Sequence, residues 1–168
     1  MQFSPGTLCS FQTVFTDDNT IVILQKAIKK FRIKVTNTSI QEFLLSHPHY
    51  PSLKSVTDTL RRFSIEHYAL NLEYKEIKEI GIPFIAHLKI SGGQLAFIDK
   101  IENGLITYSI QPGKPLVKSY HEFEEFFSGA VIVLQPNDKI VEDNYKQNKQ
   151  NELLSRGLLP LSGLSIFF

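Results

Sequence analysis

Cysteine is nearly absent from this sequence, which has only Cys9 among its 168 residues. A single thiol excludes a disulfide within the chain and a zinc site built from several thiolates. An excess of charge is also missing, because 18 Lys and Arg side chains stand against 17 Asp and Glu side chains, for a formal net charge of +1. We therefore expect no nucleic-acid partner, which usually needs a concentrated basic surface. The densest basic segment, residues 26–34, predicts a solvated helix face.

Long hydrophobic runs are scarce as well. The N-terminus has no basic segment followed by an apolar stretch, so residues 1–16 predict an extended lead-in and not a secretory signal. Residues 137–152 are polar and predict a linker or an exposed helix. Residues 153–168 are apolar again, but only twelve residues follow from Gly157, against about 20 needed to cross a bilayer. This tail either docks on the core or begins a membrane segment that the chain does not complete.

The composition that remains, with 42% apolar and 21% charged residues, is typical of one globular domain, which we place at residues 1–136. Apolar residues recur at helical spacing over residues 20–31, directly after a run of capping residues. Ser39 and Glu42 form a capping-box pattern that predicts a second helix. After a proline loop at residues 47–51, Ser52 predicts the start of a third helix.

Beyond residue 63 the hydrophobic period changes from helical to alternating. Strands are expected near residues 67–72, 84–90, 94–102, 105–110 and 130–134, and short helices near 74–80 and 119–127. Asn103-Gly104 predicts a tight hairpin, because its turn needs a positive φ at both residues. Three helices before a mostly antiparallel sheet predict the α+β class.

Three local strings, in this order, resemble cysteine peptidase family thirty-nine, the double-glycine leader peptidases of bacteriocin ABC exporters. They are residues 49–53 (His-Tyr-Pro-Ser-Leu), residues 83–88 (Pro-Phe-Ile-Ala-His-Leu) and residues 123–129, which end in Phe-Phe-Ser-Gly. The resemblance spans residues 12–136 and implies a papain-like fold. The His-Pro-x-Tyr-Pro-Ser-Leu form is especially similar to domains fused to membrane oxidoreductases of the vitamin K epoxide reductase family.

The resemblance also implies where a catalytic site would lie. A papain-like peptidase needs a thiol at a helix N-terminus, a His that exchanges a proton with it, and an Asp or Asn that orients the His. Those positions fall on Asn19, Gln94 and Gln111, and the oxyanion-hole residue of the family falls near Gln12. An amide is neither a nucleophile nor a base near neutral pH. Loss of nucleophile and base together removes about six decades of rate, so we expect no peptidase activity.

Other residues offer alternatives that the sequence leaves open. Cys9 and His87 are the pair from which a peptidase could be rebuilt with non-standard residues. The alternative, structural interpretations are that Cys9 is a thiol in the lead-in and that His87 is a hydrogen-bonded histidine in a sheet. His47 and His49 lie two positions apart in the proline loop without a third ligand nearby, so no metal site and no cofactor are expected.

What remains without catalysis is a binding surface. An apolar groove needs no catalytic residue, and aromatic or bulky residues that might line one are Phe43, Tyr50, Leu53, Tyr68 and Phe97. The leading hypothesis is a non-catalytic domain that binds a peptide or protein substrate for a membrane transporter or a membrane thiol oxidoreductase. A structural N-terminal domain of a vitamin K epoxide reductase-like enzyme is the remaining alternative. The resemblance implies a bacterial protein that is cytoplasmic or membrane-associated.

Overall fold

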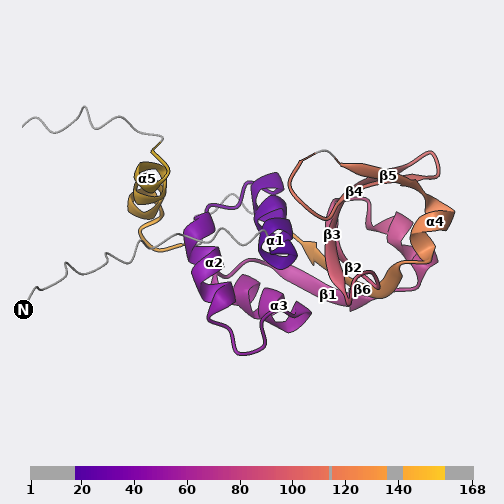
Figure 1. Cartoon of the computed structure of the whole chain (residues 1–168), viewed down its shortest axis with the longest axis horizontal. Helices are drawn as coiled ribbons and strands as arrows, with labels where there is room; N and C mark the ends of the chain where they lie inside the picture. The colour runs from indigo at the N-terminus through magenta and orange to yellow at the C-terminus, as the bar shows by residue number, and fades with distance from the viewer. Residues whose placement is uncertain (1–17, 114, 136–141, 158–168) are drawn as a thin grey trace, which may run out of the picture.

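The computed structural model describes residues 18–113, 115–135 and 142–157. In these residues three α-helices come first, and a sheet with short helical segments follows (Figure 1). The helices are α1 (Asn19–Lys30), α2 (Asn37–Leu45), α3 (Leu53–Arg62), the 3-10 helix η1 (Tyr74–Ile80), α4 (Tyr120–Glu124) and α5 (Tyr145–Ser155). The strands are β1 (His67–Asn71), β2 (Phe84–Leu88), β3 (Gln94–Glu102), β4 (Leu105–Ser109), β5 (Leu116–Ser119) and β6 (Phe127–Leu134). The predicted α+β class is confirmed.

Each of the first three helices begins at a side chain that accepts a hydrogen bond from a backbone N–H of the first turn. Asp18 caps α1, Thr36 caps α2 and Ser52 caps α3. The prediction for α2 was wrong about the cap, because the Thr36 hydroxyl accepts from the backbone N–H of Ser39 and starts the helix earlier. Such caps satisfy N–H groups that have no partner within the helix.

The strands form one six-stranded sheet in the order β1-β6-β2-β3-β4-β5, and every neighbouring pair is antiparallel. The hairpin between β3 and β4 is confirmed, since Asn103 and Gly104 both have positive φ, at 52° and 73°. Two local predictions were wrong. The helix expected over 119–127 ends at Glu124, because the chain enters β6 at Phe127, and strand β5 was not predicted at all.

The sheet separates two cores. One face packs against α1, α2 and α3, with Leu24, Leu44 and Leu60 as fully buried helix residues and Phe97 from β3. The other face packs against η1 and α4, with Ile77 and Phe123 buried there. Figure 1 shows the three helices gathered on one side of the sheet, while α4 lies at the far end beside β4 and β5. The first helix therefore lies on β3 and reaches the ends of the central strands.

A buried carboxylate ties the segment before α5 to the helical layer. Glu142, which is 6% exposed, accepts from the Thr36 backbone N–H at 2.6 Å, the Thr36 and Ser39 hydroxyls at 3.1 and 2.5 Å, and Asn148 Nδ2 at 2.7 Å. Burial alone would raise the pKa of Glu142, but these donors outweigh it and hold the pKa below its usual value of 4.5. The predicted linker or exposed helix thus contains α5, whereas the tail beyond Gly157 lies outside the described residues.

We expect Glu142→Gln to lower the free energy of unfolding by about 2 kcal/mol at neutral pH, since an amide replaces a charged acceptor of several buried donors. The pKa of Glu142 is depressed in the folded state, so this stabilisation is complete above about pH 4.5 and is lost as pH falls through the folded-state value. Urea unfolding should therefore show a difference in the free energy of unfolding between wild type and Glu142→Gln at neutral pH, and this difference should disappear in acid. Glu125→Gln, at an exposed position, is the matched control. Equal stabilities at neutral pH would contradict this account of the Glu142 carboxylate.

Candidate functional site

The N-terminus of α1 is the place where the fold would hold a nucleophile. Asp18 accepts from the backbone N–H of Thr20 at 2.8 Å and starts the helix, and Asn19 is its first residue. A helix N-terminus carries a partial positive charge that stabilises a thiolate. At residue 19, however, the chain places a neutral amide.

The Asn19 side chain is fully engaged with the backbone of β3 and of the segment that follows β4. Its Nδ2 donates to the carbonyl oxygens of Leu95 at 2.9 Å and Ile110 at 2.5 Å, and its Oδ1 accepts from the Leu95 N–H at 2.6 Å. Leu95 directly follows Gln94 at the start of β3, and Ile110 directly precedes Gln111 after β4. The structure thus brings the chain positions of Asn19, Gln94 and Gln111 together at one end of α1. Gln12 lies outside the described residues.

These three positions supply amides only, and none of them can take a proton from an attacking group near neutral pH. A titratable group close to Asn19 is Tyr50, whose hydroxyl is buried beside the Asp18 carboxylate. Burial, and next the neighbouring Asp18 carboxylate, raise the pKa of Tyr50 well above its usual value of 10. The phenol therefore stays protonated at neutral pH and cannot replace the missing base.

His87 is the histidine on a central strand. Its Nδ1 lies 2.9 Å from the Ser128 hydroxyl, and its Nε2 lies 2.8 Å from where a Cβ on Gly93 would be. Gly93, with φ of 109°, thus takes a conformation and a space that suit only glycine. This is the hydrogen-bonded sheet histidine that the sequence offered as the structural interpretation. Cys9 lies outside the described residues, so its pairing with His87 stays a prediction.

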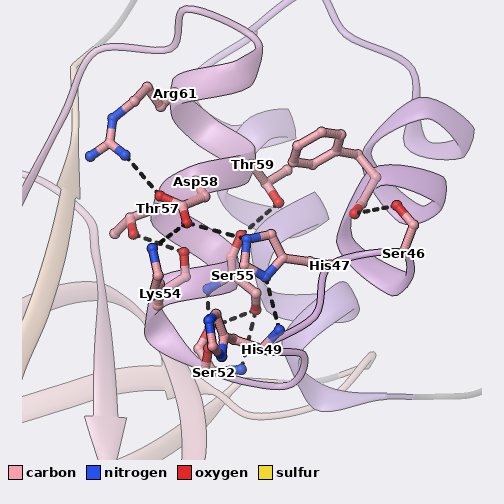
Figure 2. Close-up of polar contacts among 11 residues, drawn as sticks. Ser46, His47, His49, Ser52, Lys54, Ser55, Thr57, Asp58, Thr59 and Arg61 are labelled. Carbon is pink, nitrogen blue, oxygen red and sulfur yellow. Dashed lines mark hydrogen bonds and ion pairs between the residues drawn. The ribbon is translucent and has the colours of Figure 1, made fainter.

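The proline loop is organised by one carboxylate rather than by a metal (Figure 2). Asp58 lies 3.2 Å from His47 Nε2 and accepts from Lys54 at 2.7 Å and Arg61 at 2.8 Å. The His49 backbone N–H donates to His47 Nδ1, so the ring proton of His47 is on Nε2 and points to Asp58. Across residues 18–113, 115–135 and 142–157, no group of three or more His, Cys, Asp or Glu side chains could hold a metal ion.

The five residues predicted to line a groove do not gather in one place. Tyr50 and Leu53 are half-buried against the core under the helices, and Phe43 packs edge-on to Phe63 in the same layer, with ring centroids 6.2 Å apart. Phe97 is 1% exposed and belongs to that core. Tyr68 is 48% exposed on edge strand β1 and pairs with Val133, which belongs to the core of the opposite face. A continuous surface can therefore include Phe43, Tyr50 and Leu53, but not Tyr68.

We expect Asn19→Ala to lower the free energy of unfolding by about 2 kcal/mol, because it leaves the Leu95 N–H and two carbonyl groups without their partner. Asn19→Asp should cost more at neutral pH, since a carboxylate cannot donate to those two carbonyl oxygens. Gln25→Ala on the same helix is the matched control, as that amide makes a single long bond of 3.4 Å to the Asn37 carbonyl. Chemical denaturation of the three variants tests this, and equal losses for Asn19→Ala and Gln25→Ala would contradict it.

Several solved structures have a similar fold, and three of them are peptidase or peptidase-like domains. The peptidase domain of Streptococcus ComA, a bi-functional ABC transporter involved in a quorum-sensing pathway, matches with a TM-score of 0.62 and 15% identity over 73% of this chain and 93% of that one. A double-glycine-motif protease from an AMS/PCAT transporter, solved with its leader peptide, matches with a TM-score of 0.61 and 14% identity over 71% of this chain and 85% of that one. The peptidase C39-like domain of a toxin secretion ATP-binding protein from Vibrio parahaemolyticus matches with a TM-score of 0.59 and 13% identity over 71% of this chain and 98% of that one. These matches confirm the papain-like fold.

The family is shown by the sequence itself. No curated protein sequence matches the chain. Residues 11–139, which run from the lead-in through all six strands, match the peptidase C39 family. The resemblance carried by the three local strings is therefore confirmed at the level of the family, and this chain belongs to the peptidase C39 family.

Proposed function

We propose that this chain is a non-catalytic peptidase C39 domain that binds a peptide or protein substrate on behalf of a membrane protein. The observation that carries the proposal is the Asn19 amide, which occupies the nucleophile position and is held there by Leu95 and Ile110. The amides of Gln94 and Gln111 next to those residues cannot act as base or acid. The fold is thus retained while the groups that acyl transfer needs are replaced.

A membrane protein is the proposed partner because of what the similar domains belong to. Two of the three solved structures named above come from transporters, and one of them was solved with a leader peptide bound. No helix within the described part of this chain is long and apolar enough to span a membrane. The proposed association would therefore place a domain such as this one beside a membrane segment. A transporter and a thiol oxidoreductase of the vitamin K epoxide reductase type are both retained as the membrane protein.

The surface of Phe43, Tyr50 and Leu53 is the proposed peptide contact. It lies between α2 and α3, where the Tyr50-Pro51 bond is cis and Ser52 caps α3. The hydrogen bonds of Asp58 with His47, Lys54 and Arg61 hold this loop in place (Figure 2).

The first test is cleavage. We expect the full chain to leave a double-glycine leader peptide intact by mass spectrometry, under conditions in which an active C39 peptidase cleaves it completely. Turnover that disappears in Cys9→Ala would instead establish a peptidase with non-standard residues and would overturn the proposal.

The second test is binding of the same peptide, followed by NMR shifts of backbone amides. We expect saturable shifts near Tyr50 and Leu53, and roughly fivefold weaker binding for Leu53→Ala, the loss typical of an interface residue worth about 1 kcal/mol. Leu116→Ala, at a 43% exposed position on β5, should bind like wild type. Absence of both cleavage and binding would favour a structural N-terminal domain.

A further inference from the structure

A large concave groove runs along α1, away from the surface of Phe43, Tyr50 and Leu53. Its volume is about 990 Å³. One wall is α1 with residues 32–35 that follow it, and the other is α5. One end of the groove reaches residues 111–113, which include Gln111. The sequence predicted a solvated helix face for the basic residues of α1. That prediction missed the second wall, because α5 comes from the far end of the chain.

The groove concentrates positive charge in a protein that is nearly neutral overall. Among the residues that the structure describes, seven Lys and Arg side chains line it, but Asp99 is the one acidic side chain that does. They are Lys26, Lys29, Lys30, Arg32, Lys34, Lys149 and Arg156. The remainder of the chain therefore carries an excess of negative charge. An uneven distribution of this kind steers an anionic partner to one surface.

Several of these cations already have partners. Lys30 pairs with Asp99 at 2.6 Å, and Lys149 and Arg156 pair with Glu152 at 2.6 and 3.0 Å. Lys26 donates to the Ser109 hydroxyl at 2.6 Å. That leaves three exposed cations, which form no ion pair within the described residues: Lys29, Arg32 and Lys34. The negative end of the α1 dipole explains a cation at Lys29 in the last turn, but Arg32 and Lys34 follow the helix end.

The lining between the cations is partly apolar. Ile28, Ile33 and Val35 are buried residues that reach the groove, and Tyr145 of α5 lines it from the opposite wall. A concave channel with an apolar floor and a cationic rim matches a chain that carries acidic and apolar side chains together. It matches a flat bilayer poorly, because headgroups could not reach the floor. The α5 wall lies beyond residues 11–139, which match the family.

We infer that this groove binds an acidic, partly apolar peptide segment. The inference deepens the proposed function, on which it rests, by naming the charge of the peptide that the domain takes. The end of the groove at Gln111 places such a segment close to Asn19, whose Nδ2 donates to the carbonyl oxygen of Ile110, the residue before Gln111.

The experiment uses the full chain and a fluorescein-labelled peptide in which Glu and Leu repeat at helical spacing, followed by fluorescence anisotropy. We expect saturable binding that weakens with added salt, and no binding of the same peptide with Lys in place of Glu. Lys29→Glu/Lys34→Glu should weaken binding by about tenfold or more, as expected for reversing two rim charges. Lys75→Glu/Lys89→Glu changes the net charge equally at exposed positions outside the groove and should bind like wild type. Circular dichroism confirms that each variant is folded.

Two results would overturn the inference: no binding of the acidic peptide, or equal loss in both double variants. Tighter binding of heparin, or of vesicles of equal parts phosphatidylcholine and phosphatidylserine, that is lost in Lys29→Glu/Lys34→Glu would reassign the groove to another polyanion. The double-glycine leader peptide separates this inference from the proposed function. If the leader still binds wild type while the acidic peptide does not, the groove inference fails alone.

Discussion

The arrangement of this domain depends on one contact, the pairing of the Asn19 amide with the backbone of Leu95 and Ile110. It fixes the N-terminus of α1 against β3 and against the chain that leaves β4. A thiol at this position would leave two strand carbonyls and one N–H without that partner, because sulfur is a poor hydrogen-bond acceptor and a weak donor. The amide therefore makes a cross-link between α1 and the sheet that a thiol could not make.

Two ionisable side chains, Asp18 and Tyr50, also lie at this end of α1. The carboxylate of Asp18 is satisfied by the Thr20 N–H, and the nearby phenol of Tyr50 is held protonated by burial and by Asp18. The phenol is therefore not available as a base at neutral pH. On the proposal that the domain is non-catalytic, peptidase activity would need a thiol at residue 19, an imidazole at Gln94 and new partners for the backbone of Leu95 and Ile110.

Local signals in the sequence predicted the local structure well. The helix caps at Asp18 and Ser52 and the Asn103-Gly104 hairpin depend on neighbouring residues, and the structure confirms them. What the sequence could not predict are contacts between distant residues. The Asn19 bonds join positions 76 and 91 residues apart, and no pattern of propensity marks them. The assignment of Asn19 to the site came from resemblance to the family. Tyr68 was predicted to line the same groove as Phe43 but lies on the other face of the sheet, so an aromatic residue type alone does not predict a surface.

The basic groove could not be predicted from the sequence either, because it too depends on contacts between distant residues. From the sequence, the cations of α1 had only solvent to face, because their opposite wall is built from residues after position 141. That wall is held by Glu142, whose carboxylate caps α2 at Thr36 and also binds Asn148 at the start of α5. The buried negative charge of Glu142 thus organises a surface of positive charge: without it, α5 loses its attachment, and Lys149 and Arg156 no longer face α1 across the groove. A single carboxylate outside the family-matching residues therefore determines whether the groove exists. This couples the stability of the α5 attachment to the binding that we infer for it.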